Sequence, residues 1–395
     1  MDVRPARLEW HAFANLLKTM VGSGVLTLPF VTARVGLLFS LLGLGAIAYL
    51  TQCGIRMVVT CAAAALKSGA YRQLPPTDPA DQGGGLWSLV GGAAFGAPGR
   101  VLTLGALLTA QLGVCASYLD FVAAALHTHA AVPPHAALAG VWLLLSLLCL
   151  IRPLKAVSWL STAALLIYVY ILGLLVYFGA GAPARAAPLE WWRPRGVGAW
   201  FGPALFAFEG MGTALSIFTS MESDDPAPFY RVVSVAYACA FVVYSFAAVV
   251  GYAAWGGSVA QVVLDSFPES SLALSADLSL ACILLLSFCL QMTPVFQLAE
   301  LSLSEPCRRL WPLVRCVIVG MIAIIAAAIP DMEQMVALTG SLSFSIIGFV
   351  LPGAFFLKLS RRSLAFEHDV VVACALIVLG LGGGAFGLYT TFEGE

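Results

Sequence analysis

Residues 15–29 read Asn-Leu-Leu-Lys-Thr-Met-Val-Gly-Ser-Gly-Val-Leu-Thr-Leu-Pro and lie inside the first long apolar segment of the chain. Gly22 and Gly24, with Pro29 shortly after them, are unsuited to a continuous helix. Glycine costs about 1 kcal/mol and proline about 3 kcal/mol relative to alanine in a helix interior. A break here frees backbone N–H and C=O groups at membrane depth, where hydrocarbon offers them no partner. Such breaks are tolerated where they face protein or a wet cavity, and many transporters build their binding site around one.

The composition indicates a membrane protein. Of the 395 residues, 60% are hydrophobic and 10% are charged, whereas a soluble domain carries about 25% charged residues. The lipid bilayer is therefore an expected partner. The net charge of −1 argues against a nucleic acid partner. The ten cysteines show no metal-type spacing and are predicted to be small apolar core residues.

Hydrophobic segments of membrane-spanning length recur along the whole chain. A helix that crosses the bilayer needs about 20 apolar residues. The links between the candidate spans are too short for a second folded domain. We predict an all-α integral membrane protein of about eleven transmembrane helices, near residues 12–34, 36–65, 99–126, 137–151, 156–179, 198–219, 230–256, 277–303, 312–329, 333–358 and 369–391.

The basic residues predict the orientation, because cytoplasmic loops carry an excess of lysine and arginine. Alternate loops, starting with the N-terminus, hold fourteen basic residues, and the opposite set of loops holds four. We therefore expect a cytoplasmic N-terminus. The first set is Arg4, Arg7, Lys67, Arg72, Arg100, Arg152, Lys155, Arg231, Arg308, Arg309, Arg315, Lys358, Arg361 and Arg362, and the second is Arg34, Arg185, Arg193 and Arg195.

A second glycine-rich interruption, Phe-Glu-Gly-Met-Gly at residues 208–212, falls in the sixth predicted span. If spans one and six each open a five-helix unit, the two units enter the membrane from opposite sides. Interrupted helices at matching places of inverted halves indicate a mid-membrane substrate site, although either break alone is also explained by helix packing through small residues. We divide the chain into a cytoplasmic N-terminus (1–11), a first repeat (12–179), an outer linker (180–197), a second repeat (198–358) and an inner loop with the eleventh helix (359–395).

Five stretches, in order and spacing, resemble the amino acid/auxin permease family, most of all its proton-coupled amino acid transporter branch. Residues 15–29 look like the first-helix signature of the family, and residues 207–210, Ala-Phe-Glu-Gly, are similar to the sixth-helix motif of the branch. Residues 111–118, 151–155 and 340–343 also resemble that branch. The resemblance covers essentially the whole chain. It implies a leucine-transporter-type fold, with a 5+5 inverted repeat and broken helices 1 and 6.

The residues at the two breaks are the candidate substrate site. Freed N–H groups at the first break lie beside the positive end of the following half-helix and suit a carboxylate. Freed carbonyls at the second break, together with a carboxylate side chain, suit an ammonium group, and two aromatic residues are candidate walls or gates. The predicted substrate-binding residues are Gly22, Ser23, Gly24, Tyr118, Phe208, Glu209 and Gly210.

Glu209, Lys18 and Asn15 are the candidate coupling residues. A carboxylate inside a span is costly when charged and unpaired, so Glu209 is a functional hypothesis by default, with Lys18 as its natural counter-charge. Relatives in the proton-coupled branch often show a histidine where this chain has Asn15. The sodium-coupled branch resembles the chain at Asn15 but not at Lys18, so a proton is favoured over sodium.

We expect a secondary transporter that moves small neutral amino acids with a proton by alternating access. A sodium-coupled transporter remains an alternative, as does an amino-acid sensor that binds the same ligand without net transport. An enzyme is not expected, since no metal-type cluster occurs and His127, His129 and His135 fall near an outer loop. No cofactor and no obligate protein partner are expected. The plasma membrane and a vacuolar or lysosomal membrane both fit.

Overall fold

The protein folds into a bundle of helices. The computed structural model describes residues 3–67, 83–150, 157–182, 188–221, 225–302, 310–329, 331–360 and 367–393, and all the regular secondary structure in these ranges is helical. Nine helices there are long and apolar enough to cross a membrane, or ten if the bent pair Leu8–Met20 and Gly24–Val35 is one span. The protein is therefore an all-α, multi-span membrane protein.

The elements follow the predicted spans closely. The first half of the chain forms α1 (Val3–Met20), α2 (Gly24–Val35), α3 (Leu37–Lys67), α4 (Gly83–Ala130), α5 (Pro134–Leu150) and α6 (Val157–Ala180). The second half forms η3 (Pro194–Gly196), α7 (Val197–Ala207), α8 (Met211–Ser220), α9 (Ala227–Trp255), η4 (Gly256–Ser258), η5 (Val263–Ser266), α10 (Ser271–Gln291), α11 (Thr293–Ser302), α12 (Trp311–Ala328), α13 (Met332–Leu338), η7 (Thr339–Val350), α14 (Leu351–Leu359) and α15 (Glu367–Glu393).

Two features differ from the predicted spans. The third span was expected to begin at residue 99, but α4 begins at Gly83 and bends at Phe95 and Gly96, where Gly96 has a φ of 68°. The glycine-rich start of α4 hid this helix from the hydropathy pattern. α5 has only 17 residues, so the count of eleven spans also needs this short helix to cross the membrane.

The chain leaves regular α-helix at both glycine-rich stretches. α1 ends at Met20 and α2 begins at Gly24, with a bend of 50° between them. α7 ends at Ala207 and α8 begins at Met211. α10 and α11 meet at Met292, just before Pro294, but this junction is not a break of the same kind, because the N–H of Met292 donates to Phe288 and its carbonyl oxygen accepts from Phe296, as in a continuous helix.

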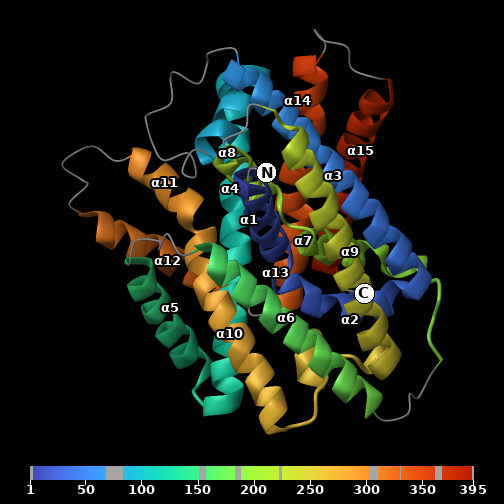
Figure 1. The fold of residues 1–395 in the computed structure, drawn as a ribbon. Helices are drawn as coiled ribbons and strands as arrows, with labels where there is room; N and C mark the ends of the chain where they lie inside the picture. Colours follow the sequence, from blue (N-terminus) through green and yellow to red (C-terminus); the bar gives the residue numbers. More distant parts are fainter. Residues whose placement is uncertain are drawn as a thin grey trace.

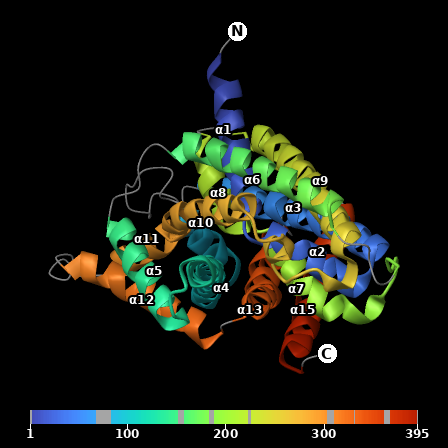
Figure 2. The ribbon, with the colours of Figure 1, turned by 90° about the horizontal axis from the view of Figure 1, so that it is seen from below.

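The interrupted helices lie in the interior of the bundle. α1 is at the centre of Figure 1, where it contacts α6, α8 and α9. α4 is a second centre, seen almost end-on in Figure 2, and contacts α5, α8, α10 and η7. α5 and α12 lie on one side of these central helices, and α3, α14 and α15 lie on the other (Figure 1).

Glycines let the interrupted helices approach their neighbours closely. A Cβ at Gly251 of α9 would lie 2.6 Å from the ring of Pro29, so the bare backbone of α9 accommodates the proline of α2. A Cβ at Gly24 would lie 2.9 Å from the Cα of Ala207. α2 is thus packed against both α7 and α9, and small residues at such contacts are typical of membrane helices.

Gly340 makes the corresponding contact between η7 and α7, and we expect Gly340→Ala to destabilise the fold. A Cβ at Gly340 would overlap the carbonyl oxygen of Gly202, and overpacking of this kind costs about 1–3 kcal/mol. The thermal unfolding midpoint of the purified protein in detergent should fall. The matched control is Gly348→Ala in the same π-helix, where no atom lies within 4 Å of the added Cβ. Equal midpoints for the two variants would contradict this packing.

Candidate functional site

The two breaks meet in the interior of the protein. A Cβ at Gly210 would lie 3.2 Å from the Cγ of Met20 and 3.3 Å from a Cδ of Leu16, both on α1. Gly24 of α2 faces Ala207 and Phe206 of α7 across an equally short distance. The absence of side chains at Gly24 and Gly210 therefore brings the first break directly against the second.

The first break carries hydrogen-bond donors without a backbone acceptor. The N–H of Gly22 donates to the carbonyl oxygen of Met20 at 2.8 Å, so it is not free, contrary to the expectation from sequence. The N–H groups of Ser23 and Gly24 have no backbone acceptor within the described residues. The hydroxyl of Ser23 is fully buried and also lacks a hydrogen-bond partner there. Three donors thus remain at the positive end of the α2 dipole.

The second break has most of its carbonyl groups already bonded. The hydroxyl of Tyr244 donates to the carbonyl oxygen of Ala207 at 2.6 Å, and that of Tyr237 donates to the carbonyl oxygen of Phe208 at 3.2 Å. The N–H of Glu209 donates to the carbonyl oxygen of Phe206. The expectation of free carbonyls for a substrate ammonium is therefore wrong at these positions. The carboxylate of Glu209 remains as a charged hydrogen-bond acceptor at this break.

The carboxylate of Glu209 is hydrogen-bonded by a side chain of α10. Its side chain lies in the break with an exposed fraction of 4%. The amide nitrogen of Gln291 donates to both carboxylate oxygens, at 3.0 and 2.9 Å, and the amide nitrogen of Gln111 on α4 donates to the backbone carbonyl oxygen of Gln291 at 3.1 Å. Sequence reasoning did not single out Gln291. The usable signal was an amide residue followed by Thr293 and Pro294 inside an apolar span.

Lys18 lies in the last turn of α1, close enough for its charge to interact with that of Glu209. No salt bridge within 4.0 Å joins the two in the described part of the chain. Asn15 lies three residues earlier, half-buried, and its carbonyl oxygen accepts a hydrogen bond from the hydroxyl of Thr19. The structure thus associates Lys18 with Glu209.

The two candidate aromatic residues are both buried at the breaks. The hydroxyl of Tyr118 on α4 lies 3.2 Å from the position that a Cβ of Gly22 would take. The ring of Phe208 is stacked with Tyr237, with centroids 6.0 Å apart, and meets Tyr244 edge-on at 4.8 Å. Tyr118 therefore reaches the first break, while Phe208 forms part of an aromatic wall at the second.

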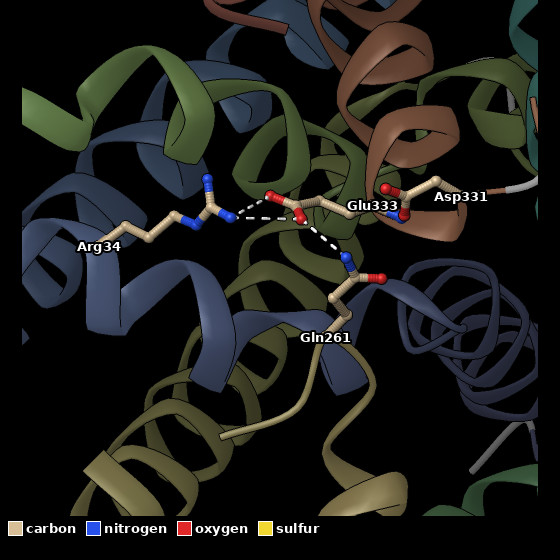
Figure 3. Close-up of polar contacts among 4 residues, drawn as sticks. All are labelled: Arg34, Gln261, Asp331 and Glu333. Carbon is tan, nitrogen blue, oxygen red and sulfur yellow. Dashed lines mark hydrogen bonds and ion pairs between the residues drawn. The ribbon is translucent and has the colours of Figure 1, made fainter. Parts of the chain in front are cut away.

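A separate polar cluster links the far end of α2 to α13 (Figure 3). Arg34 lies 3.1 Å from an oxygen of Glu333, and the side-chain amide of Gln261 donates to the other oxygen of that carboxylate at 3.2 Å. Asp331 caps α13 by accepting a hydrogen bond from the N–H of Glu333. This ion pair joins residues 299 positions apart in the chain, and sequence reasoning did not find it.

Broken helices that meet around buried donors and a buried carboxylate define a membrane transporter. The chain belongs to the transmembrane amino acid transporter protein family, whose sequence profile matches residues 9–393. Amino acid transport is therefore its function class, and it is not an enzyme.

Known relatives and structures agree with that assignment. Amino acid transporter AVT3B of Arabidopsis thaliana is 25% identical over 99% of this chain and 95% of its own. Vacuolar amino acid transporter 3 of Saccharomyces cerevisiae is 25% identical over 96% of this chain and 55% of its own. The crystal structure of MhsT in complex with L-phenylalanine aligns with a TM-score of 0.52 and 15% identity, over 96% of this chain and 98% of that one. The fold is therefore of the leucine-transporter type.

The hydroxyl of Ser23, which has no hydrogen-bond partner in the part of the chain that the structure describes, is available to a ligand. Removing a buried hydroxyl that has no partner should leave the stability of the empty protein unchanged or raise it. If the hydroxyl donates to a substrate carboxylate, Ser23→Ala should raise the KM for amino acid uptake by roughly tenfold, the effect of one hydrogen bond to a charged group. Uptake kinetics in proteoliposomes and the thermal unfolding midpoint are the two measurements.

Ser40 is the matched control, because its buried hydroxyl bonds to Thr32 at 2.8 Å and accepts from the indole of Trp200 at 3.1 Å. Ser40→Ala should lower the unfolding midpoint and leave KM nearly unchanged. A normal KM in Ser23→Ala would exclude that hydroxyl from substrate binding.

Proposed function

We propose that the protein transports small neutral amino acids together with a proton by alternating access. The observation that carries the proposal is the pairing of opposite chemistries at the breaks. Donors of Ser23 and Gly24 remain at one break, and the buried carboxylate of Glu209 lies at the other. A zwitterion carries the complementary groups on one carbon atom: a carboxylate for the donors, and an ammonium for the oxygens of Glu209, which keep acceptor capacity after a proton binds.

The charges around the site support a substrate without a net charge. Lys18 and Glu209 carry opposite charges and interact with each other when both are ionised. Their charges then largely cancel, so little electrostatic attraction remains for a charged substrate side chain. The buried aromatic residues Tyr118 and Phe208 supply apolar surface beside the breaks. These features favour a small neutral amino acid.

A proton suits the pair of Lys18 and Glu209 better than a sodium ion does. A positive charge close to the carboxylate repels a bound cation, whereas a carboxyl group that takes up a proton becomes neutral. Sodium binding also requires several oxygen ligands, and Ala207 and Phe208 already use their carbonyl oxygens to accept from tyrosine hydroxyls. We therefore assign the coupling role to Glu209, with Lys18 as its counter-charge and Asn15 as a neighbouring residue of α1.

The cluster of Arg34, Gln261 and Glu333 supports alternating access. It ties the end of α2, which leads away from the first break, to α13 and to the segment between η4 and η5. The side chains of Arg34 and Glu333 remain 29% and 16% exposed, so water can reach both partners when the contact opens. In our proposal this contact closes the side of the protein opposite the cytoplasm while the site exchanges substrate with the cytoplasm.

We place the protein in the vacuolar membrane with a cytoplasmic N-terminus. The support for the membrane is the name and coverage of the yeast relative, a vacuolar amino acid transporter. The support for the orientation is the excess of basic residues in alternate loops, fourteen against four. In an acidic compartment, symport with a proton would carry amino acids toward the cytosol.

The coupling assignment is tested with Glu209→Gln. Glutamine resembles the protonated carboxyl group in shape and charge but cannot release a proton. The variant should keep exchange of labelled for unlabelled amino acid and lose accumulation driven by an imposed pH gradient in proteoliposomes. Glu190→Gln is the control, because Glu190 lies outside the breaks and more than half of its side chain is exposed. Normal pH-driven accumulation by Glu209→Gln would assign coupling to another group, and uptake that requires sodium and ignores pH would overturn proton symport.

The orientation is tested with single cysteines in a cysteine-free background. Arg231 and Arg193 are both largely exposed, with side-chain exposures of 68% and 55%, and we assign them to opposite sides. A membrane-impermeant thiol reagent is added to sealed right-side-out and inside-out vesicles. It should label Arg193→Cys in one kind of vesicle and Arg231→Cys in the other. Labelling of both from the same side would overturn the assignment of loops and the inverted repeat with it.

A further inference from the structure

We propose that Gln291 is a positioning residue. Its side chain changes its hydrogen bonding with the charge state of Glu209, and this rearrangement is passed to the junction of α10 and α11. The inference rests on the proposed function, in which Glu209 takes up and releases the coupling proton. It connects the candidate substrate site to the junction of α10 and α11, through which the helical hydrogen bonds of Met292 continue.

The first step is that Gln291 donates directly to the carboxylate of Glu209. The amide nitrogen of Gln291 lies 3.0 and 2.9 Å from the two oxygens of Glu209. Gln291 is the side chain that hydrogen-bonds this carboxylate within the described residues. Both its amide and the carboxylate are buried, so water does not readily replace either partner, and the bond is specific to the charge state of Glu209.

The second step is the change that a proton forces on this contact. An ionised carboxylate only accepts hydrogen bonds, and here its two oxygens share the amide nitrogen of Gln291 as donor. A protonated carboxyl group carries an O–H donor on one oxygen, which then faces an N–H donor of Gln291. Either one bond is lost, or the amide rotates and presents its oxygen to the O–H. Gln291 therefore has two arrangements, one for each charge state.

The third step is the connection to the backbone. Gln291 is the last residue of α10, and α11 begins at Thr293. Its carbonyl oxygen accepts from the amide nitrogen of Gln111 on α4, while the amide oxygen of Gln111 is buried and has no partner in the described chain. A turn of the Gln291 side chain thus acts on the end of α10, which is tied to α4 through the amide of Gln111 and continues into α11 through the helical hydrogen bonds of Met292.

Other groups that face Glu209 act through charge or packing. Lys18 approaches from α1, Cys115 and Tyr118 from α4, and Tyr237 and Tyr244 from α9. Both tyrosines of α9 already donate to backbone carbonyls of the second break. Among these neighbours, Gln291 alone combines a direct bond to the carboxylate with a place at the junction of two helices.

The test is the pH profile of uptake by Gln291→Met and Gln291→Leu in proteoliposomes. Both variants remove the donor to the ionised carboxylate, and methionine keeps the length of the side chain. Loss of that donor favours the protonated form. The pH of half-maximal uptake should therefore move to higher pH by roughly one to two units, the equivalent of a lost hydrogen bond to a charged group. Exchange at saturating substrate should stay within a few-fold of the unmodified protein.

Two further variants make the result specific. Gln52→Met is the control, because Gln52 donates to Ser234 at 3.3 Å and has no contact with Glu209; it should leave the profile unchanged. Gln291→Met combined with Glu209→Gln should show no pH shift beyond that of Glu209→Gln alone. A folded Gln291→Met with the unmodified profile would overturn the role of Gln291 while leaving proton coupling by Glu209 intact. Retained pH-driven accumulation in Glu209→Gln would instead overturn the proposed function itself.

Discussion

The need to pair every backbone polar group at membrane depth controls this structure. Hydrocarbon supplies no hydrogen bonds, so each interruption of a helix must find its partners in protein or ligand. The second break meets the requirement through Tyr237 and Tyr244, whose hydroxyls donate to the carbonyl oxygens of residues 208 and 207. The first break meets it only in part, because the N–H groups of Ser23 and Gly24 have no backbone acceptor in the described part of the chain. This unmet part of the requirement is why we propose the first break as a place for a ligand.

The two breaks are chemically unequal although both are glycine-rich. The first retains donors at the start of α2, and the second retains the carboxylate of Glu209, with its neighbouring carbonyls satisfied. Gly24 and Gly210 allow these unlike groups to approach within van der Waals distance of the facing backbone and side chains. The site therefore has hydrogen-bond donors at one broken helix and a carboxylate at the other. This difference arises because the surrounding side chains bond the backbone groups of the second break and not those of the first. The glycines themselves do not cause it.

Local sequence features predicted the helices and the breaks, because hydropathy and glycine or proline content act over short stretches. They could not predict partners that depend on tertiary packing. The bond from Gln291 to Glu209 joins residues 82 positions apart, and that from Arg34 to Glu333 joins residues 299 apart. The expectation of free carbonyls at the second break failed for the same reason, since the donors come from α9. The glycine-rich start of α4 was missed because its residues lack a clear apolar pattern.

The charges of Lys18 and Glu209 bear on which step of a transport cycle the membrane potential drives. With both groups ionised, the empty site carries no net charge, and a bound zwitterion adds none. A proton on Glu209 leaves Lys18 uncompensated, so the loaded site carries one positive charge in the proposed mechanism. Moving one charge through 100 mV is worth about 2.3 kcal/mol. The potential would then act on the loaded transition and leave the return of the empty carrier nearly independent of voltage. In the proposed mechanism, Lys18 near Glu209 would therefore make the return step electrically neutral without any further counter-ion.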